Sequence, residues 1–228
     1  MKRTLLLVAA AILIALPMTA FADTFTFQAP PTAPNEGNGG SKQFDLDHHK
    51  AYTWSIDKNL AGQTITSATL TFKSISNWDT NPNMLFVHLL DAAKNPGVAS
   101  FIDASGVPVP SSEIADNFAG SLFGSNPLVN PGTASIYLGA RSFSTVATTW
   151  TITFTAAQLQ ALNAYFQNGN NIAFGFDPDC HFWNDGIVFT INTEHTAVPE
   201  PMTLTLLGTG IAGMYLKRRR RRQVTPQI

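Results

Sequence analysis

Two stretches of this 228-residue chain alternate apolar side chains with threonines, and this alternation limits the folds open to it. Residues 149–155 read TWTITFT, with Trp150, Ile152 and Phe154 on one face, and residues 64–72 read TITSATLTF. A period of two residues is that of a β-strand with one buried and one solvated face. Such strands are typical of antiparallel sheets, so the sequence predicts an antiparallel β protein.

The rest of the chain adds short strands and one helix. Further β-branched or aromatic runs lie at residues 85–90, 134–138, 172–176 and 187–191. A helix is predicted at residues 156–167, because Thr155 and Gln158 fit a capping box at its start. Many short strands with a single helix predict a jelly-roll-like antiparallel β-sandwich over residues 44–194. A flexible, Pro- and Gly-rich lead-in is predicted before it, at residues 23–43.

The first 22 residues have the three parts of a secretory signal peptide. A basic start precedes an apolar run at residues 5–16, and Ala20 and Ala22 provide small residues at the minus-three and minus-one positions. The chain is therefore predicted to pass through the Sec translocon and to be cut before Asp23. The alternative is an uncleaved anchor helix, although the apolar run is short for a span of ~20 residues.

A second hydrophobic segment lies near the other end of the chain, at residues 202–216, before a basic tail at residues 217–228. As a helix its 15 residues would rise about 22 Å, against a hydrocarbon core of ~30 Å, so it predicts a marginal transmembrane segment. Basic flanks stay in the cytoplasm. The domain before the segment is therefore predicted to be periplasmic, and transiently anchored to the inner membrane.

The residues that precede this segment resemble a known sorting signal. Val198, Pro199, Glu200 and Pro201, in a linker at residues 195–201, are followed by a short span and an Arg-rich end. This order resembles the PEP-CTERM sorting region of proteins from Gram-negative bacteria. The resemblance implies recognition and removal of the tail by an exosortase, a membrane protease-transpeptidase. It also implies a final location at the cell surface or outside the cell, as for other members.

Charge and cysteine content narrow the function further. Residues 23–197 hold 6 of the 14 basic and 14 of the 15 acidic residues, which gives this part a net charge of −8. An acidic exported domain is a poor partner for nucleic acid or anionic lipid. The single cysteine, Cys180, excludes an intramolecular disulfide, so stability has to come from the core.

An acidic loop at residues 175–186 is a candidate cation site. Three carboxylates within nine residues repel one another unless a positive charge lies among them, and Ca²⁺ prefers oxygen ligands of this kind. The candidate ligands are Asp177, Asp179, Asn184 and Asp185, joined by Asp45 and Asp47 if the first and last strands lie close together. The alternative is that these residues only form the hydrogen bonds of a long hairpin turn.

Other side chains in the same stretches admit weaker hypotheses. Cys180 beside His181, with Asp185 near, fits a cysteine nucleophile, but an isolated cysteine is more often a small buried apolar residue. A zinc site would combine His48, His49, Cys180 and His181. His88, in an apolar strand, is predicted to be a core residue. Trp54 and Trp183 are candidates for stacking on sugar rings, and the alternative is that such aromatic residues belong to the core.

These observations predict an exported, exosortase-processed surface or extracellular-matrix protein that associates with exopolysaccharide or biofilm. Its β-sandwich is predicted to be non-catalytic, and no catalytic residue is assigned. One alternative is a carbohydrate-binding module with a structural Ca²⁺. Another is a secreted hydrolase, because the carboxylates of a glycosidase are brought together in space and not in sequence.

Overall fold

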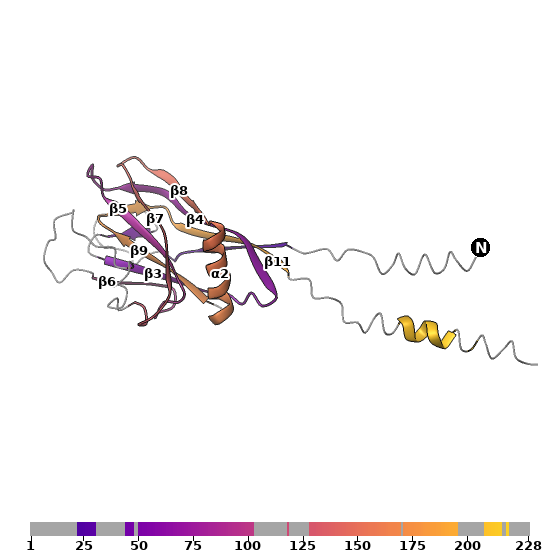
Figure 1. Cartoon of the computed structure of the whole chain (residues 1–228). Coiled ribbons are helices and arrows are strands. Elements are labelled where there is room, and N and C mark those ends of the chain that lie inside the picture. The colour runs from indigo at the N-terminus through magenta and orange to yellow at the C-terminus, as the bar shows by residue number, and fades with distance from the viewer. Residues whose placement is uncertain are drawn as a thin grey trace, which may run out of the picture. The chain divides into compact units, whose positions relative to one another are not determined.

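The computed structural model describes residues 22–30, 44–47, 50–102, 118, 128–169, 171–195, 208–215 and 218. The chain divides into two units, of which Phe21–His195 contains both sheets and the capped helix (Figure 1). The predicted signal peptide lies outside the described residues apart from Ala22, and so does the sorting stretch at residues 198–201.

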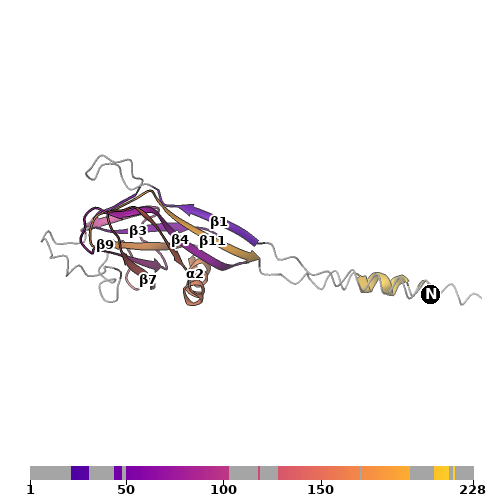
Figure 2. The same cartoon turned by 90° about the horizontal axis from the view of Figure 1, so that it is seen from above.

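One sheet has six strands and contains both ends of the domain. Its members are β1 (Ala22–Gln28), β11 (Ile187–His195), β4 (Gln63–Asn77), β10 (Phe182–Asn184) and β2 (Phe44–Leu46) in that order, with β8 (Thr148–Thr153) also paired to β4. All of these pairs are antiparallel. Strand β1 lies along β11, so the first and last strands are neighbours (Figure 2).

Strand β1 corrects the prediction of a flexible lead-in from residue 23. Thr24, Phe25, Thr26 and Phe27 follow the same alternation as the other strands, and they pair with β11 from Ala22 to Gln28. The alternating pattern covers only four residues and is followed directly by a Pro- and Gly-rich stretch. The strand was therefore not predicted from the sequence. The domain therefore begins with β1 and not at residue 44.

The second sheet has five strands, and all of its pairs are antiparallel. Its order is β6 (Val98–Ile102), β3 (Lys50–Asp57), β9 (Asn171–Pro178), β5 (Met84–Leu90) and β7 (Ser135–Ser142). The prediction of a mainly β, antiparallel domain is thereby confirmed.

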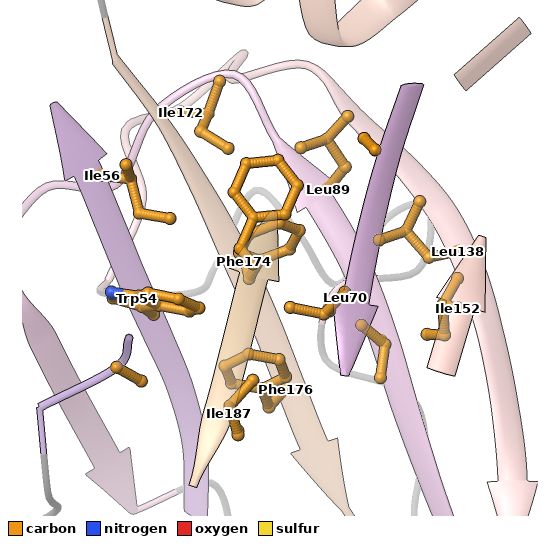
Figure 3. Close-up of a cluster of buried hydrophobic side chains, with 14 of the residues drawn as sticks. Trp54, Ile56, Leu70, Leu89, Leu138, Ile152, Ile172, Phe174, Phe176 and Ile187 are labelled. Carbon is orange, nitrogen blue, oxygen red and sulfur yellow. The ribbon is translucent and has the colours of Figure 1, made fainter. Parts of the chain in front are cut away.

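Aromatic side chains from the two sheets meet in one core. Phe72 of β4 contacts Phe176 of β9 edge to face at 5.6 Å between ring centroids, and Phe174 of β9 contacts Phe189 of β11 at 4.9 Å. These four rings are fully buried. Apolar side chains of both sheets surround Phe174 in Figure 3. The inward half of each alternating strand therefore supplies the core, as the sequence predicts.

Trp54 of β3 belongs to this core. It is 3% exposed and its ring centroid lies 5.6 Å from that of Phe174 (Figure 3). A side chain buried in this way cannot stack on a sugar ring. Its prediction as a ligand-binding residue is therefore wrong, whereas His88, 3% exposed, is the core residue that its apolar strand predicted.

Helix α2 (Ala156–Gly169) begins with the predicted capping box. The Thr155 amide donates to Gln158 Oε1 at 2.8 Å, and the Gln158 amide donates to Thr155 Oγ1 at 3.3 Å. Leu162 and Phe166 face the core. On the same helix Asn163 accepts from the Ile65 amide at 2.8 Å and donates to the Ile65 carbonyl at 3.0 Å, which fixes α2 to the start of β4.

Residues 208–215, in the second unit, form another short helix with exposed side chains (yellow in Figure 1). Over the part of the chain that the structure describes, no helix is both long and apolar enough to cross a membrane. The remaining residues of the predicted segment at 202–216, and all of the basic tail at 217–228 except Arg218, lie outside the described residues.

Candidate functional site

The two polar stretches singled out by the sequence meet where β2 pairs with β10. In this pairing Trp183 lies opposite Asp45, and Phe182 lies opposite Leu46. Leu46 and Phe182 are fully buried in the core, so their neighbours face outward. The expectation that Asp45 and Asp47 would meet the acidic loop is confirmed.

His181 lies between two carboxylates in this arrangement. Its Nε2 contacts Asp45 Oδ1, and its Nδ1 lies 3.3 Å from Asp47 Oδ1. The second oxygen of Asp47 lies 3.5 Å from Lys50 Nζ. We call Asp45, Asp47, His181 and Trp183 the histidine cluster. Because each ring nitrogen faces a different carboxylate, the arrangement fits a charged imidazolium held by two acids.

Burial and charge act in opposite directions on His181. Burial lowers the pKa of its imidazole, but the hydrogen bond and charge of Asp45, followed by those of Asp47, outweigh burial and raise that pKa above its usual value. Next to it, burial raises the pKa of Tyr52, whose hydroxyl accepts a hydrogen bond from the Asp47 amide at 2.9 Å. Burial lowers the pKa of Lys50. The cluster thus favours a protonated histidine at the sheet surface.

Two tryptophans contact His181, one through its ring and one through its backbone. The Trp183 ring, partly buried, meets the imidazole edge to face with 5.6 Å between centroids. Trp78 is 51% exposed, and its backbone amide donates to the His181 carbonyl at 3.0 Å. Trp183 was predicted as a ligand-binding residue, and its position beside the outward carboxylates keeps that prediction open.

The candidate calcium ligands take separate positions around the loop. Asp177 is buried on β9, and Asp179 Oδ2 accepts from the Met84 amide at 3.3 Å. Asn184 Oδ1 accepts from the Gly186 amide at 2.9 Å, and Asp185 is exposed. Among the residues that the structure describes, no group of three or more His, Cys, Asp or Glu side chains could hold a metal ion. The bond from Gly186 to Asn184 is what the alternative, a hairpin turn, requires.

The cysteine hypotheses have little support from the local chemistry. Burial raises the pKa of Cys180, which favours the neutral thiol over the nucleophilic thiolate. His181 directs its ring nitrogens toward Asp45 and Asp47. His48 and His49, the other candidate zinc ligands, lie outside the described residues.

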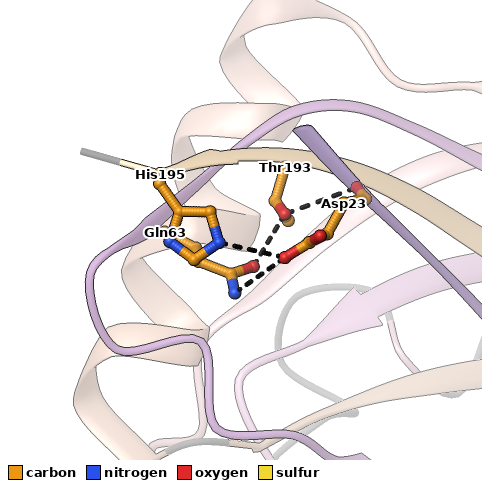
Figure 4. Close-up of polar contacts among 4 residues, drawn as sticks. All are labelled: Asp23, Gln63, Thr193 and His195. Carbon is orange, nitrogen blue, oxygen red and sulfur yellow. Dashed lines mark hydrogen bonds and ion pairs between the residues drawn. The ribbon is translucent and has the colours of Figure 1, made fainter. Parts of the chain in front are cut away.

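A second polar cluster lies at the other end of β4, where β1 begins and β11 ends (Figure 4). His195 Nε2 lies 3.0 Å from Asp23 Oδ2, which also accepts from Gln63 Nε2 at 3.3 Å. Thr193 Oγ1 donates at 2.7 Å to Gln63 Oε1 and lies 3.4 Å from the Asp23 carbonyl oxygen. We call these four residues the strand-end cluster. The sequence analysis missed it, because only recognition of β1 would have brought Asp23 to His195.

Just beyond this cluster, residues 197–222 match the family model described as the PEP-CTERM protein-sorting motif. The chain carries a PEP-CTERM sorting motif. The match confirms the resemblance carried by Pro199, Glu200 and Pro201, and it begins two residues after β11 ends at His195. No curated protein and no solved structure matches the chain.

The motif has a direct meaning for the chain's route. It implies export and membrane-associated sorting toward the cell surface, with an exosortase-type enzyme as the processing partner. The β domain, Phe21–His195, precedes the sorting motif in the chain, and the strand-end cluster includes its last residue, His195.

Proposed function

We propose that this PEP-CTERM protein is an exosortase-processed surface or extracellular-matrix protein whose β domain is non-catalytic and is retained among exopolysaccharide. The observation that carries the proposal is the sorting motif at residues 197–222, placed directly after the last strand of the domain. The signal peptide predicted at residues 1–22 and the transmembrane segment predicted at 202–216 fit this route, with the domain periplasmic before the tail is removed.

Local chemistry supports a non-catalytic domain. The raised pKa of the Cys180 thiol disfavours a nucleophile. Both ring nitrogens of His181 are already directed at carboxylates, those of Asp45 and Asp47. The deeply buried Asp177 has no exposed face toward a substrate.

The strand order supports the finer fold assignment, a jelly-roll sandwich. Pairs are nested from the ends of the chain toward its middle: β1 with β11, β2 with β10, β3 with β9, β4 with β8, and β5 with β7. A single long antiparallel hairpin that is rolled up gives this nesting, and rolling divides its strands between two sheets. Core contacts between Phe72 and Phe176 fit two sheets packed face to face.

Removal of the tail is the direct test. The full chain is produced in an exosortase-containing host, and the C-terminus of the cell-surface form is determined by mass spectrometry. We expect the wild type to lose its basic end, and Glu200→Ala together with Pro199→Ala to keep it. Pro226→Ala, a proline substitution outside the matched residues, is the control and should be processed normally. An intact basic tail on mature, surface-bound wild type would refute the proposal.

A second candidate, a carbohydrate-binding module, is favoured by the outer face of the six-stranded sheet. Within the histidine cluster this face presents the partly buried Trp183. Uncharged polar side chains continue it: Thr24 Oγ1 donates to Asn192 Oδ1 at 2.7 Å, and Asn192 Nδ2 donates to Ser67 Oγ at 2.7 Å. An aromatic ring near carboxylates and hydroxyls is the mixture of groups that binds sugars.

Affinity electrophoresis in polysaccharide gels tests this candidate, with Ca²⁺ and with a chelator. Retention should fall for Trp183→Ala and Trp78→Ala. The control is Tyr137→Ala on the other sheet, whose side chain is as exposed as that of Trp78, at 51%. Wild-type mobility that is unchanged in every gel would exclude the binding module and leave the sorting proposal untouched.

A further inference from the structure

The short connection between the domain and the sorting motif carries an inference about the processing partner. We infer that the folded domain docks against the exosortase-type enzyme through one end of the six-stranded sheet. This docking surface consists of Asp23, Thr64, Glu194 and His195. The inference rests on the proposed function, because it assumes that this enzyme binds the motif.

The first step is that β11 is held in the sheet up to its last residue. Glu194 pairs with Ala22 of β1 on one side and with Thr64 of β4 on the other, and His195 pairs with Gln63. Thr193 is fully buried, and its hydroxyl donates to Gln63 Oε1 at 2.7 Å. A strand paired on both sides cannot leave the sheet without breaking these hydrogen bonds. The domain therefore has no unpaired residue of β11 that could lengthen the connection before residue 196.

The second step is the reach of the chain. Three residues, 196–198, separate His195 from Pro199. Since a fully extended chain spans at most ~3.6 Å per residue, the Cα atom of Pro199 lies no more than about 14 Å from that of His195. A folded domain as long as Phe21–His195 has a radius of gyration of about 16 Å. An enzyme that encloses Pro199 in a cleft must therefore meet the end of the sheet.

The third step is the chemistry of this surface. Glu194 is exposed, and the side chains of Asp23 and His195 are each 44% exposed. Two carboxylates beside one histidine favour a basic partner surface, and they oppose close approach to anionic lipid headgroups. A protein partner with basic side chains fits this end better than the membrane surface does.

Site-specific photocrosslinking tests the contact in the full chain. A benzophenone amino acid replaces Glu194 in one variant and Thr64 in a second, in a host whose exosortase-type enzyme is catalytically inactive, so that the uncut chain accumulates. The control replaces Val146, which is 72% exposed near Ser144, whose carbonyl accepts from Asn77 at the opposite end of β4. We expect adducts with the enzyme from positions 194 and 64, and no adduct from position 146.

A linker variant gives the second arm. About 20 Gly and Ser residues inserted between His195 and Thr196 have a root-mean-square length of roughly 25 Å. The effective concentration of the docking surface at the enzyme then falls, so the yield of the adducts at positions 194 and 64 should decrease. With the active enzyme, the intact motif of this variant should still be cut.

The outcomes separate the two proposals. If the wild-type tail is never removed, the proposed function fails. If the tail is removed but positions 194 and 64 give no adduct, or all three positions give equal adducts, the docking inference alone is overturned. An undiminished yield of both adducts in the linker variant would also overturn it, since the contact would then not depend on the short connection.

Discussion

The two ends of the six-stranded sheet carry the same chemical pair in different surroundings. At one end His181 faces Asp45 and Asp47, and its side chain is 10% exposed. At the other end His195 faces Asp23, and both side chains are 44% exposed. Strand β4 connects these ends, and its 15 residues span about 45 Å.

This difference indicates that burial, more than the residue types, decides how much a His–Asp pair contributes to stability. His181 is nearly buried and its two carboxylate partners are partly buried, so this cluster is less screened, and loss of one partner leaves charge that water compensates only in part. An exposed pair is screened by water and salt, and is worth ~0–1 kcal/mol. We therefore assign a structural role to the histidine cluster, whereas the strand-end cluster leaves its charges accessible at the boundary with the tail.

The largest expected effect on stability comes from a substitution in the core that both ends of the sheet share. Phe174 is fully buried and contacts both Trp54 and Phe189. Phe174→Ala should lower the free energy of unfolding by about 3–5 kcal/mol. The control Val146→Ala, at an exposed position, should stay within about 0.5 kcal/mol. Urea unfolding measures both, and hydrogen exchange should show weaker protection at both ends; preserved protection at either end would contradict a shared core.

The next effect sharpens the contrast between the ends. Asp45→Ala removes the carboxylate that His181 Nε2 contacts, and leaves Asp47 as the remaining acid of the cluster. We expect a loss of about 1.5–3 kcal/mol in the free energy of unfolding at pH 6, the range for hydrogen bonds to charged groups. Asp45→Asn keeps the shape but removes the charge, so it should fall between wild type and Asp45→Ala. A loss no larger than that of Asp23→Ala would mean that burial does not separate the two clusters.

The pH dependence gives an independent measure of the buried end. The folded-state pKa of His181 is raised above the usual value near 6.5, so its stabilisation is complete below that value and is lost as pH rises through the folded-state pKa. The difference in unfolding free energy between wild type and His181→Gln should be largest near pH 6 and shrink toward alkaline pH. A difference that stays constant between pH 6 and 9 would show that the imidazole is not charged in the folded state.

The smallest effect concerns the exposed end. Asp23→Ala removes the contacts to His195 and Gln63 and should cost ~0–1 kcal/mol, with the loss reduced further in high salt. Unfolding at low and high ionic strength measures this. A salt-independent loss of several kcal/mol would indicate that the strand-end cluster is a buried network.

Local patterns predicted those parts of the molecule that local physics decides. The alternation in β4 and β8 predicted antiparallel sheets, and the capping box of Thr155 and Gln158 predicted the start of α2. Contacts between distant segments were harder. The pairing of Asp45 with the loop of Trp183 was predicted only because the first and last strands of a β-sandwich often lie close together. The burial of Trp54 depends on which face of β3 meets Phe174. Because Ala51, Tyr52, Thr53 and Trp54 are all buried, alternation does not separate a core face from an outer face in β3.

If the signal peptide is cut where it is predicted to end, the register of β1 sets an order of events during export. The peptide bond between Ala22 and Asp23, where the signal peptide is predicted to end, lies inside the ladder with β11, opposite Glu194 and Thr193. Proteases take their substrates as free extended strands, and a strand already paired in a sheet does not enter a cleft. A cut at this bond therefore has to precede the docking of β1. The delivered protein would complete its sheet only after release from its leader, and a precursor that folds too early would protect its own cleavage site.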